Sequence, residues 1–264
     1  MPQMHSSGVL VLGHSAESRN TGLNADERAV AAQEVPVVSV STASSRNDAA
    51  ERPEIVAVMP PVLKQEIDHA AQNLDCKVIK IGALFSEESI QVVAGLLRQC
   101  SSTMSVVDVE PFFKAGSTPA PETVSAFRKH ILPSATLISS TVQEAKILLD
   151  DAGIAVEYPK SMEDVQAMAE ALRRLGPQYA MIKREILNES GTKSMLHFVL
   201  CGGPEPQLSS TLWENPKAFF GVSYSIPSAI SALLTKGYNV PEAVSGGFAF
   251  VGEMLKGGDY FESV

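Results

Sequence analysis

Short runs of Val, Ile and Leu alternate with longer stretches of mixed polar and apolar residues along this chain, and that alternation limits its fold more than any other feature. Runs of this kind indicate buried strands, and stretches with apolar residues three and four positions apart indicate helices. Alternating strands and helices build a mostly parallel sheet with helices on both faces. We therefore predict an α/β fold, a three-layer α/β/α sandwich around a mostly parallel central sheet.

The expected elements follow from the same patterns. Strands are expected at residues 8–12, 35–41, 77–81, 104–108, 135–139, 179–183 and 196–200. Helices are expected at residues 24–33, 60–72, 122–132, 227–236 and 241–256, after Ser86 as an N-cap, and after the Ser161–Asp164 capping box. Pro227 and Pro241 stand in the first turns of the last two helices. The polar segment 44–53 is expected to be a loop or flap.

Chain length and charge narrow the class of protein. The 264 residues suit one large core, so we predict a single domain over residues 1–264, with a flexible N-terminus at 1–7. The formal net charge is −9 without a Lys/Arg cluster, which argues against a nucleic-acid partner. No apolar run has the roughly 18 residues that a membrane span requires. Three cysteines, at positions 76, 100 and 201, lack metal-binding spacing and are typical of free thiols in a cytoplasmic protein.

The residues that follow each strand form the candidate site, because ligands of such sheets bind at the carboxyl ends of the strands. The loop from Gly13 to Asp26 contains neither the G-x-G-x-x-G nor the G-x-x-x-x-G-K-[ST] phosphate-binding motif. Asp108 and Glu110 follow a predicted strand. Two carboxylates in that place can hold Mg²⁺, and they can equally belong to a solvated loop.

Two more strand ends carry hydroxyl groups or glycine. Residues 139–141 are Ser, Ser and Thr, and Glu144 stands in the first turn of the helix that follows. These hydroxyls can cap that helix or contact a ligand. The segment 219–228 holds one glycine, Gly221, ahead of an apolar helix, and a helix N-terminus preceded by glycine is a natural anion site.

Several stretches, taken in order, resemble the hydroxymethylpyrimidine and hydroxymethylpyrimidine-phosphate kinase family of thiamine biosynthesis, a ribokinase-like family related to the pyridoxal kinases. The matching stretches are GLNAD at 22–26, KIGAL at 80–84, Asp108 with KAG at 114–116, Leu132-Pro133, Glu144-Ala145, Ala229-Ile230, Lys236-Gly237 and EAV at 242–244. The resemblance implies a ribokinase-like fold, Mg²⁺–ATP as phosphoryl donor, an aromatic heterocycle such as a pyrimidine or a pyridine as acceptor, and a homodimer.

The resemblance also implies roles for individual residues. The substrate-pocket positions are Gly13, His14, Glu17, Asn24, Asp26, Lys80 and Gly82. The nucleotide-side positions are Ser139, Thr141 and Lys183, and the magnesium positions are Asp108 and Glu144. The catalytic positions are Gly221, Ser223 and Tyr224, with Tyr224 in the place of the family's catalytic Cys.

The chain departs from the family in two loops that contact substrate and phosphate. The family's G-S-D-S-S-G-G-A-G loop is replaced by bulkier residues at 14–21, and its G-T-G-C loop reads Gly221-Val222-Ser223-Tyr224. In the family, backbone N–H groups of the second loop surround the transferred phosphoryl group. Ser223 hinders the close backbone approach that a glycine permits, and Tyr224 places a bulky phenol where the base would stand.

Three functions remain open at this stage. The altered loops favour a non-catalytic or very weakly active homologue that binds a small molecule, alone or beside an active homologue. The second function is an active ATP-dependent hydroxymethylpyrimidine or pyridoxal-type kinase, which requires Mg²⁺–ATP. The third is a repurposed enzyme that does not use ATP, in which His14 with Glu17 or Tyr224 supplies acid–base chemistry.

Overall fold

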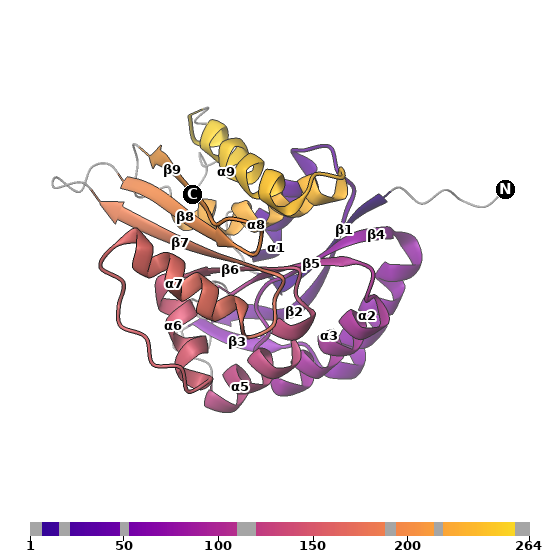
Figure 1. Ribbon diagram of the computed structural model, residues 1–264. Coiled ribbons are helices and arrows are strands. Elements are labelled where there is room, and N and C mark those ends of the chain that lie inside the picture. The colour runs from indigo at the N-terminus through magenta and orange to yellow at the C-terminus, as the bar shows by residue number, and fades with distance from the viewer. Residues whose placement is uncertain are drawn as a thin grey trace.

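One sheet of nine strands organises the part of the chain that the structure describes (Figure 1). The computed structural model describes residues 7–15, 22–47, 53–109, 120–187, 194–213 and 219–256. The strands are β1 Ser7–Ser15, β2 Val37–Asn47, β3 Pro53–Ala57, β4 Asp75–Ile81, β5 Met104–Asp108, β6 Leu137–Thr141, β7 Tyr179–Leu187, β8 Ser194–Cys201 and β9 Gln207–Trp213. Their order is β3-β2-β1-β4-β5-β6-β7-β8-β9.

Six adjacent strands, from β2 to β7 in this order, run parallel to one another. Only β3, β8 and β9 pair antiparallel with their neighbours. The prediction of a mostly parallel sheet is therefore confirmed. It follows that the carboxyl ends of β1, β4, β5, β6 and β7 lie along the same edge of the sheet.

Helices cover both faces of the sheet (Figure 1). They are α1 Gly22–Ala31, α2 Pro60–Asn73, α3 Glu87–Gln99, α5 Pro121–His130, α6 Val142–Asp151, α7 Met162–Arg173, α8 Phe219–Thr235, α9 Val240–Lys256 and the 3-10 helix η1 Leu132–Ser134. The core on one face contains residues of α1, α8 and α9, and we call it the α8 face. The core on the other face contains residues of α2, α3, α5, α6 and α7, and we call it the α3 face.

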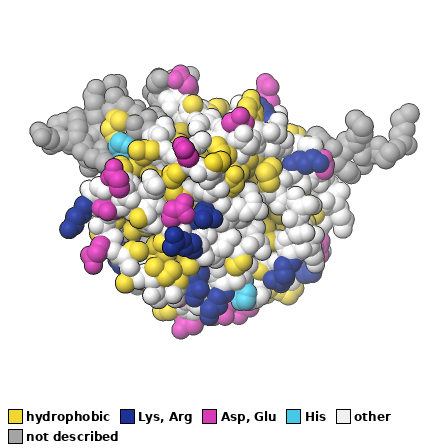
Figure 2. Space-filling model, viewed as in Figure 1, with side chains coloured by type: hydrophobic (Ala, Val, Ile, Leu, Met, Phe, Trp, Pro, Cys, Tyr) yellow, Lys and Arg dark blue, Asp and Glu magenta, His cyan; other side chains and the backbone are white. Residues whose placement is uncertain are grey.

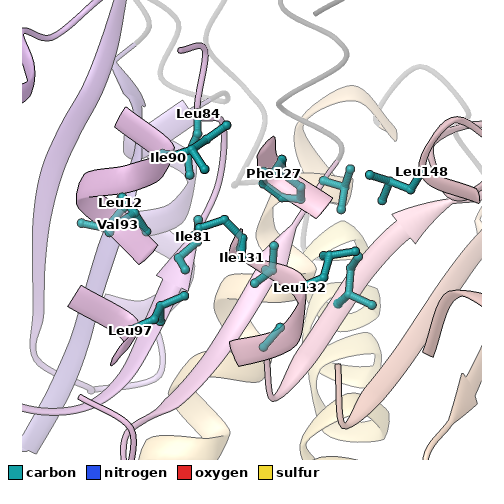
Figure 3. Packing of buried hydrophobic residues seen from close by; sticks show 14 of the residues in the cluster. Leu12, Ile81, Leu84, Ile90, Val93, Leu97, Phe127, Ile131, Leu132 and Leu148 are labelled. Atoms are coloured by element: carbon teal, nitrogen blue, oxygen red, sulfur yellow. The ribbon is translucent and has the colours of Figure 1, made fainter. Parts of the chain in front are cut away.

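Burial on both faces explains why the central strands read as continuous apolar runs. In β1, Val9 and Val11 belong to the core of the α8 face, whereas Leu10 and Leu12 belong to the core of the α3 face. Figure 3 shows the α3 face, where Leu12 and Ile81 of neighbouring strands lie near side chains of α3.

Two predicted helix starts are confirmed by their capping contacts. The hydroxyl of Ser86 accepts a hydrogen bond from the backbone N–H of Ser89 at the start of α3. Ser161 and Asp164 form the predicted capping box of α7, because each side chain accepts from the backbone N–H of the other. These starts could be predicted because capping uses residues only three positions apart.

The start of α8 and the segment 44–53 differ from the predictions. Helix α8 begins at Phe219, so Pro227 lies inside the helix instead of in its first turn. Residues 221–224, which were expected to form a loop, are therefore helical. Proline removes only one helical hydrogen bond, so the helix can continue upstream at an energetic cost. In the segment 44–53, β2 continues to Asn47 and β3 begins at Pro53, and the two strands pair.

The strands β3 and β9 were not predicted from the sequence. Both lie at the edges of the sheet. Edge strands bury fewer side chains, so their polar sequences, such as QLSSTLW in β9, lack the apolar pattern of a central strand. Of the predicted flexible N-terminus, Ser7 already belongs to β1, and residues 1–6 lie outside the described ranges.

The structure also describes the charged surface and the three cysteines. Acidic and basic side chains are interspersed on the face shown in Figure 2. Within the described ranges, no helix combines the length and the apolar character that crossing a membrane requires. All three cysteines have free thiols: Cys201 is buried, and Cys76 and Cys100 are half-buried.

Phe127 provides a test of the core on the α3 face, because its ring is fully buried there (Figure 3). We expect Phe127→Ala to lower the free energy of unfolding by about 3–5 kcal/mol, since a large cavity remains. Urea denaturation followed by circular dichroism measures this change. The matched control is Tyr158→Ala, because Tyr158 is 62% exposed. A loss below about 1 kcal/mol for Phe127→Ala would contradict this packing.

Candidate functional site at the carboxyl edge of the sheet

Four polar side chains lie near the carboxyl edge on one face of four adjacent strands, β4 to β7. They are Lys80, Asp108, Ser139 and Lys183, and each is at most 2% exposed. The residue two positions before each of them belongs to the core of the α8 face. Side chains two positions apart in a strand point to the same face, so all four point toward that face. We call these four residues the polar row.

The first member of the row, Lys80, belongs to a buried charged cluster. Its Nζ lies 2.8 Å from both carboxylate oxygens of Asp26, which comes from α1. The hydroxyl of Ser228, on α8, donates a hydrogen bond of 2.6 Å to the same carboxylate. Both charged side chains are nearly inaccessible to water, at 1% and 3%. The cluster therefore joins β4, α1 and α8 at the carboxyl edge.

Two glycines bring the backbone close to this cluster. A Cβ on Gly82 would lie 3.4 Å from Lys80 Nζ and from the carbonyl oxygen of Leu12, and the N–H of Gly82 donates to that carbonyl. A Cβ on Gly13 would lie 3.2 Å from the Leu23 side chain and 3.6 Å from Asp26. The small size of both residues keeps the strand ends of β1 and β4 against the ion pair.

A second buried ion pair lies further along the row. Lys183 Nζ and Asp108 Oδ1 are 3.6 Å apart, and both side chains are at most 1% exposed. This separation is an electrostatic contact and exceeds the range of a hydrogen bond. Ser139 stands between them in the sheet, because it is the partner of Asp108 across β5 and β6. Its hydroxyl has no hydrogen-bond partner within the described ranges.

The residues Thr141 and Glu144 form a capping box at the start of α6. The backbone N–H of Thr141 donates to Glu144 Oε2 at 2.7 Å, and the N–H of Glu144 donates to the Thr141 hydroxyl at 3.5 Å. The capping interpretation of these hydroxyls is therefore confirmed for Thr141. The carboxylate of Glu144 is only 4% exposed, and β6 leads directly from the polar row into this turn.

The acidic residues fit a magnesium ion that also binds phosphate, and they do not form a complete cage. Within the described ranges, no group of three or more His, Cys, Asp or Glu side chains can hold a metal ion. Mg²⁺ usually takes one or two carboxylates and completes its octahedron with waters and substrate phosphates. Asp108, the last residue of β5, and Glu144, in the first turn of α6, are two buried carboxylates that could supply such ligands.

His14 stands at the end of β1, where its ring meets Phe85 edge-on at a centroid distance of 6.2 Å. Its Nδ1 is buried and has no hydrogen-bond partner in the described part of the chain. Burial lowers the pKa of His14, Asp26 raises it, and Lys80 lowers it. Since burial has the largest effect, the imidazole is neutral at neutral pH.

The remaining predicted site residues belong to α1, to α8 and to the segment after β1. Asn24 is half-buried in the first turn of α1. Gly221, Ser223 and Tyr224 contribute backbone to the first two turns of α8, and their side chains lie outside the description. Glu17 falls wholly outside the described residues.

Ser228 is the site residue that the sequence patterns missed. The sequence contains a pattern that could have indicated it: Ser225, Ser228 and Ser231 recur at three-residue spacing within an otherwise apolar helix. All three are buried, and a buried hydroxyl on an apolar helix needs a hydrogen-bond partner. The sequence alone did not show which residue that partner is.

The sequence and the fold resemble those of vitamin-precursor kinases. The sequence matches the family described as phosphomethylpyrimidine kinase over residues 18–262. A putative hydroxymethylpyrimidine/phosphomethylpyrimidine kinase of Schizosaccharomyces pombe is 26% identical over 246 residues, which cover 88% of this chain and 74% of that protein. The hydroxymethylpyrimidine/phosphomethylpyrimidine kinase of Mycobacterium tuberculosis is 27% identical over 260 residues, with coverages of 97% and 90%. The chain spans about half the length of two other curated relatives.

The pyridoxal kinase from Staphylococcus aureus, solved in complex with AMP-PCP, superimposes with a TM-score of 0.80. The two chains are 23% identical, and the match covers 95% of this chain and 88% of that one. This similarity shows a shared ribokinase-like fold.

The buried ion pair of Lys80 and Asp26 makes a prediction about stability. Lys80→Met should lower the free energy of unfolding by about 3–5 kcal/mol, because it leaves the Asp26 carboxylate buried without its cation. Urea denaturation at pH 7 measures the loss. The control is Lys64→Met, which breaks an exposed ion pair with Asp68 and should change little.

A double variant separates the loss of charge pairing from the loss of packing. Lys80→Met combined with Asp26→Asn should recover part of the stability, since no unpaired charge is then buried. Wild-type stability in Lys80→Met alone would show that the pair does not hold the three elements together.

Proposed function

The chain belongs to the phosphomethylpyrimidine kinase family, and we propose that it is an ATP-dependent kinase that phosphorylates the hydroxymethyl group of an aromatic pyrimidine or pyridine. The observation that carries this proposal is the polar row with its two buried ion pairs at the carboxyl edge. In open α/β sheets, ligands bind at that edge.

The energetic cost of the row supports a functional interpretation. Removing the three charged groups of the row and Asp26 from water costs several kcal/mol for each ion before their mutual attraction is counted. An apolar core of the same shape would be at least as stable. Strained or costly polar arrangements concentrate at functional sites, so the row is better explained by ligand binding than by folding.

We propose that the two ends of the row contact different parts of the reaction. Asp26, Lys80, Gly13, Gly82 and Asn24 form the side that binds the heterocycle. There the backbone of the two glycines can approach a flat ring, and the ion pair supplies fixed polar groups.

Lys183, Ser139 and Thr141 form the nucleotide side in this proposal. Lys183 supplies positive charge for a phosphate, and the Ser139 hydroxyl supplies a donor that no described protein group uses. Asp108 and Glu144 would hold Mg²⁺, which neutralises phosphate charge when it is bound. The S. aureus pyridoxal kinase of the same fold binds AMP-PCP, which supports a nucleotide at this edge.

The start of α8 supplies a candidate anion site for the transferred phosphoryl group. The first four N–H groups of an α-helix lack intrahelical acceptors, and the positive end of the helix dipole lies there. Because α8 begins at Phe219, the free donors within the helix belong to residues 219–221 and include Gly221. The N–H groups of Ser223 and Tyr224 fall within the hydrogen-bonded part of the helix. The free donors therefore begin about two residues upstream of residues 221–224, which correspond to the family's G-T-G-C loop.

A second candidate function is a binding protein with little or no turnover. The observation that favours it is the same helical segment, because α8 includes the residues that stand in place of the glycine-rich anion loop. Phosphoryl transfer depends on placing donors around developing charge, and losing one such donor typically costs roughly 10²–10³ in rate.

Steady-state release of ADP with hydroxymethylpyrimidine or pyridoxal as acceptor distinguishes the two candidates. The kinase proposal expects turnover of about 1 s⁻¹ or more, at the low end of typical kinases. No acceptor-dependent ADP release above background, combined with heterocycle binding, would select the second candidate. In that case, the double variant Ser223→Gly, Tyr224→Cys should raise the rate.

Glu144→Gln tests the magnesium role without removing the helix cap. A glutamine at the third helical position can still accept the N–H of Thr141, but it loses the negative charge. We expect a fall in kcat of at least about tenfold and a higher magnesium requirement, with the thermal midpoint nearly unchanged. The control is Asp164→Asn, which removes the carboxylate from the exposed capping box of α7. Equal magnesium dependence in wild type and Glu144→Gln would rule out the role.

We further propose that the protein is a homodimer in the cytosol. The free thiols of Cys76, Cys100 and Cys201 support a reducing compartment, and the kinase resemblance supports the dimer. Light scattering coupled to size-exclusion chromatography gives the oligomeric state, and a monomeric mass at micromolar concentration would reject the dimer.

A further inference from the structure

His14 occupies an irregular point at the carboxyl end of β1. Gly13 pairs with Ser41 of β2, but His14 pairs with Ala43. The pairing register of β1 and β2 therefore shifts by one residue between Gly13 and His14. Shifts of this kind re-aim side chains and are frequent next to active sites. The extra residue at this shift is Thr42 of β2, so β2 carries the irregularity beside His14.

The His14 imidazole leaves a polar atom buried without a described protein partner. Its Nδ1 is inaccessible to water and makes no hydrogen bond within the described ranges. Leaving such a group unsatisfied costs about 1–3 kcal/mol. The ring itself is held by its edge-on contact with Phe85, which follows β4. This arrangement costs stability unless a bound molecule completes it.

Burial, and not the net effect of the charges around it, lowers the pKa of His14 and keeps the imidazole neutral. Asp26 on α1 and Lys80 on β4 are the charged groups that act on it, and they form an ion pair with each other. On β2 its neighbour is the uncharged Ala43. Burial lowers the pKa of His14 below the ordinary value of 6.5. A neutral imidazole has one nitrogen with a free lone pair, and this lone pair is lost on protonation.

We propose that His14 is a specificity-determining residue that accepts, through Nδ1, a hydrogen bond from an amino or hydroxyl substituent on the ring of the heterocyclic substrate. Its place beside the Asp26–Lys80 pair puts it on the heterocycle side of the polar row. The inference rests on the substrate class of the proposed function, and it does not require that phosphoryl transfer occurs. A site that hydrogen-bonds a substrate substituent rejects the analogue that lacks it, because a buried polar group is then unsatisfied.

The test measures binding of two ligands that differ by one donor. Isothermal titration calorimetry without nucleotide compares 4-amino-5-hydroxymethyl-2-methylpyrimidine with the analogue that lacks the 4-amino group. Wild type should bind the amino compound about tenfold more tightly, as one hydrogen bond predicts. His14→Ala should bind both compounds equally.

Conservative variants separate ligand recognition from a structural role. The amide of asparagine reaches the position of Nδ1, whereas the amide of glutamine reaches the position of Nε2. His14→Asn should therefore restore most of the preference for the amino compound, and His14→Gln should not. The control is His69→Ala, an exposed histidine of α2 whose ring lies 3.4 Å from the side-chain amide of Asn73. It should keep the full preference.

The pH dependence gives an independent readout. Because the pKa of His14 is lowered, the preference should stay constant from pH 8 to 6.5 and fall only in more acidic solution. Below the folded-state pKa the acceptor lone pair carries a proton, and the preference disappears. The His14→Asn variant should show no such fall.

Each outcome bears on the inference in a distinct way. A preference that persists in His14→Ala overturns the inference and leaves the proposed kinase function standing. Failure of wild type to bind either pyrimidine overturns the inference together with the proposed pyrimidine substrate. A preference lost in His14→Ala and restored in His14→Asn supports the inference, even for a protein that releases no ADP.

Discussion

The buried contact among Asp26, Lys80 and Ser228 is the interaction on which the rest of the site depends. It joins α1, β4 and α8, and its two charges are almost wholly removed from water. Apolar packing alone tolerates small shifts of a helix on a sheet, whereas a buried charge cannot be separated from its partner without a large cost. The contact therefore sets the position of α8 on β1, β4 and β5, and with it the position of the helix start at the carboxyl edge.

The polar row extends this arrangement across the sheet. Its order along the strands is cation, anion, hydroxyl and cation, and Asp26 balances the first of these charges. Under the proposed function, such a row supplies groups for both a heterocycle and a polyphosphate in one continuous environment. Phosphoryl transfer makes few covalent demands on a protein, so the placement of these groups and of the α8 N-terminus would then determine the rate.

Family membership and the start of α8 bear on the proposed phosphoryl transfer in opposite directions. The chain belongs to the phosphomethylpyrimidine kinase family, and it shares its fold with a pyridoxal kinase. The helical state of residues 221–224 moves the free N–H groups upstream, toward Phe219. A ligand that binds between the strand ends and α8 has to use donors at 219–221, or the first turns have to unwind. Pro227 weakens the helix at that boundary, because the carbonyl of Ser223 receives no hydrogen bond from it.

The sequence by itself determined the fold class, the strands of the parallel core and the starts of α3 and α7. Apolar periodicity and capping are local, so contacts within a few residues decide them. It also indicated which residues would lie at the carboxyl edge, including Lys80 and Asp26. Only the tertiary structure decided that these two residues pair, that Ser228 joins them, that β3 and β9 complete the sheet, and that α8 begins upstream of its proline. These outcomes depend on partners 54 and 202 residues apart and on packing at sheet edges. A local sequence pattern cannot predict contacts between residues so far apart in the chain. These polar side chains come together only when the chain folds, and once they are buried they need hydrogen-bond partners.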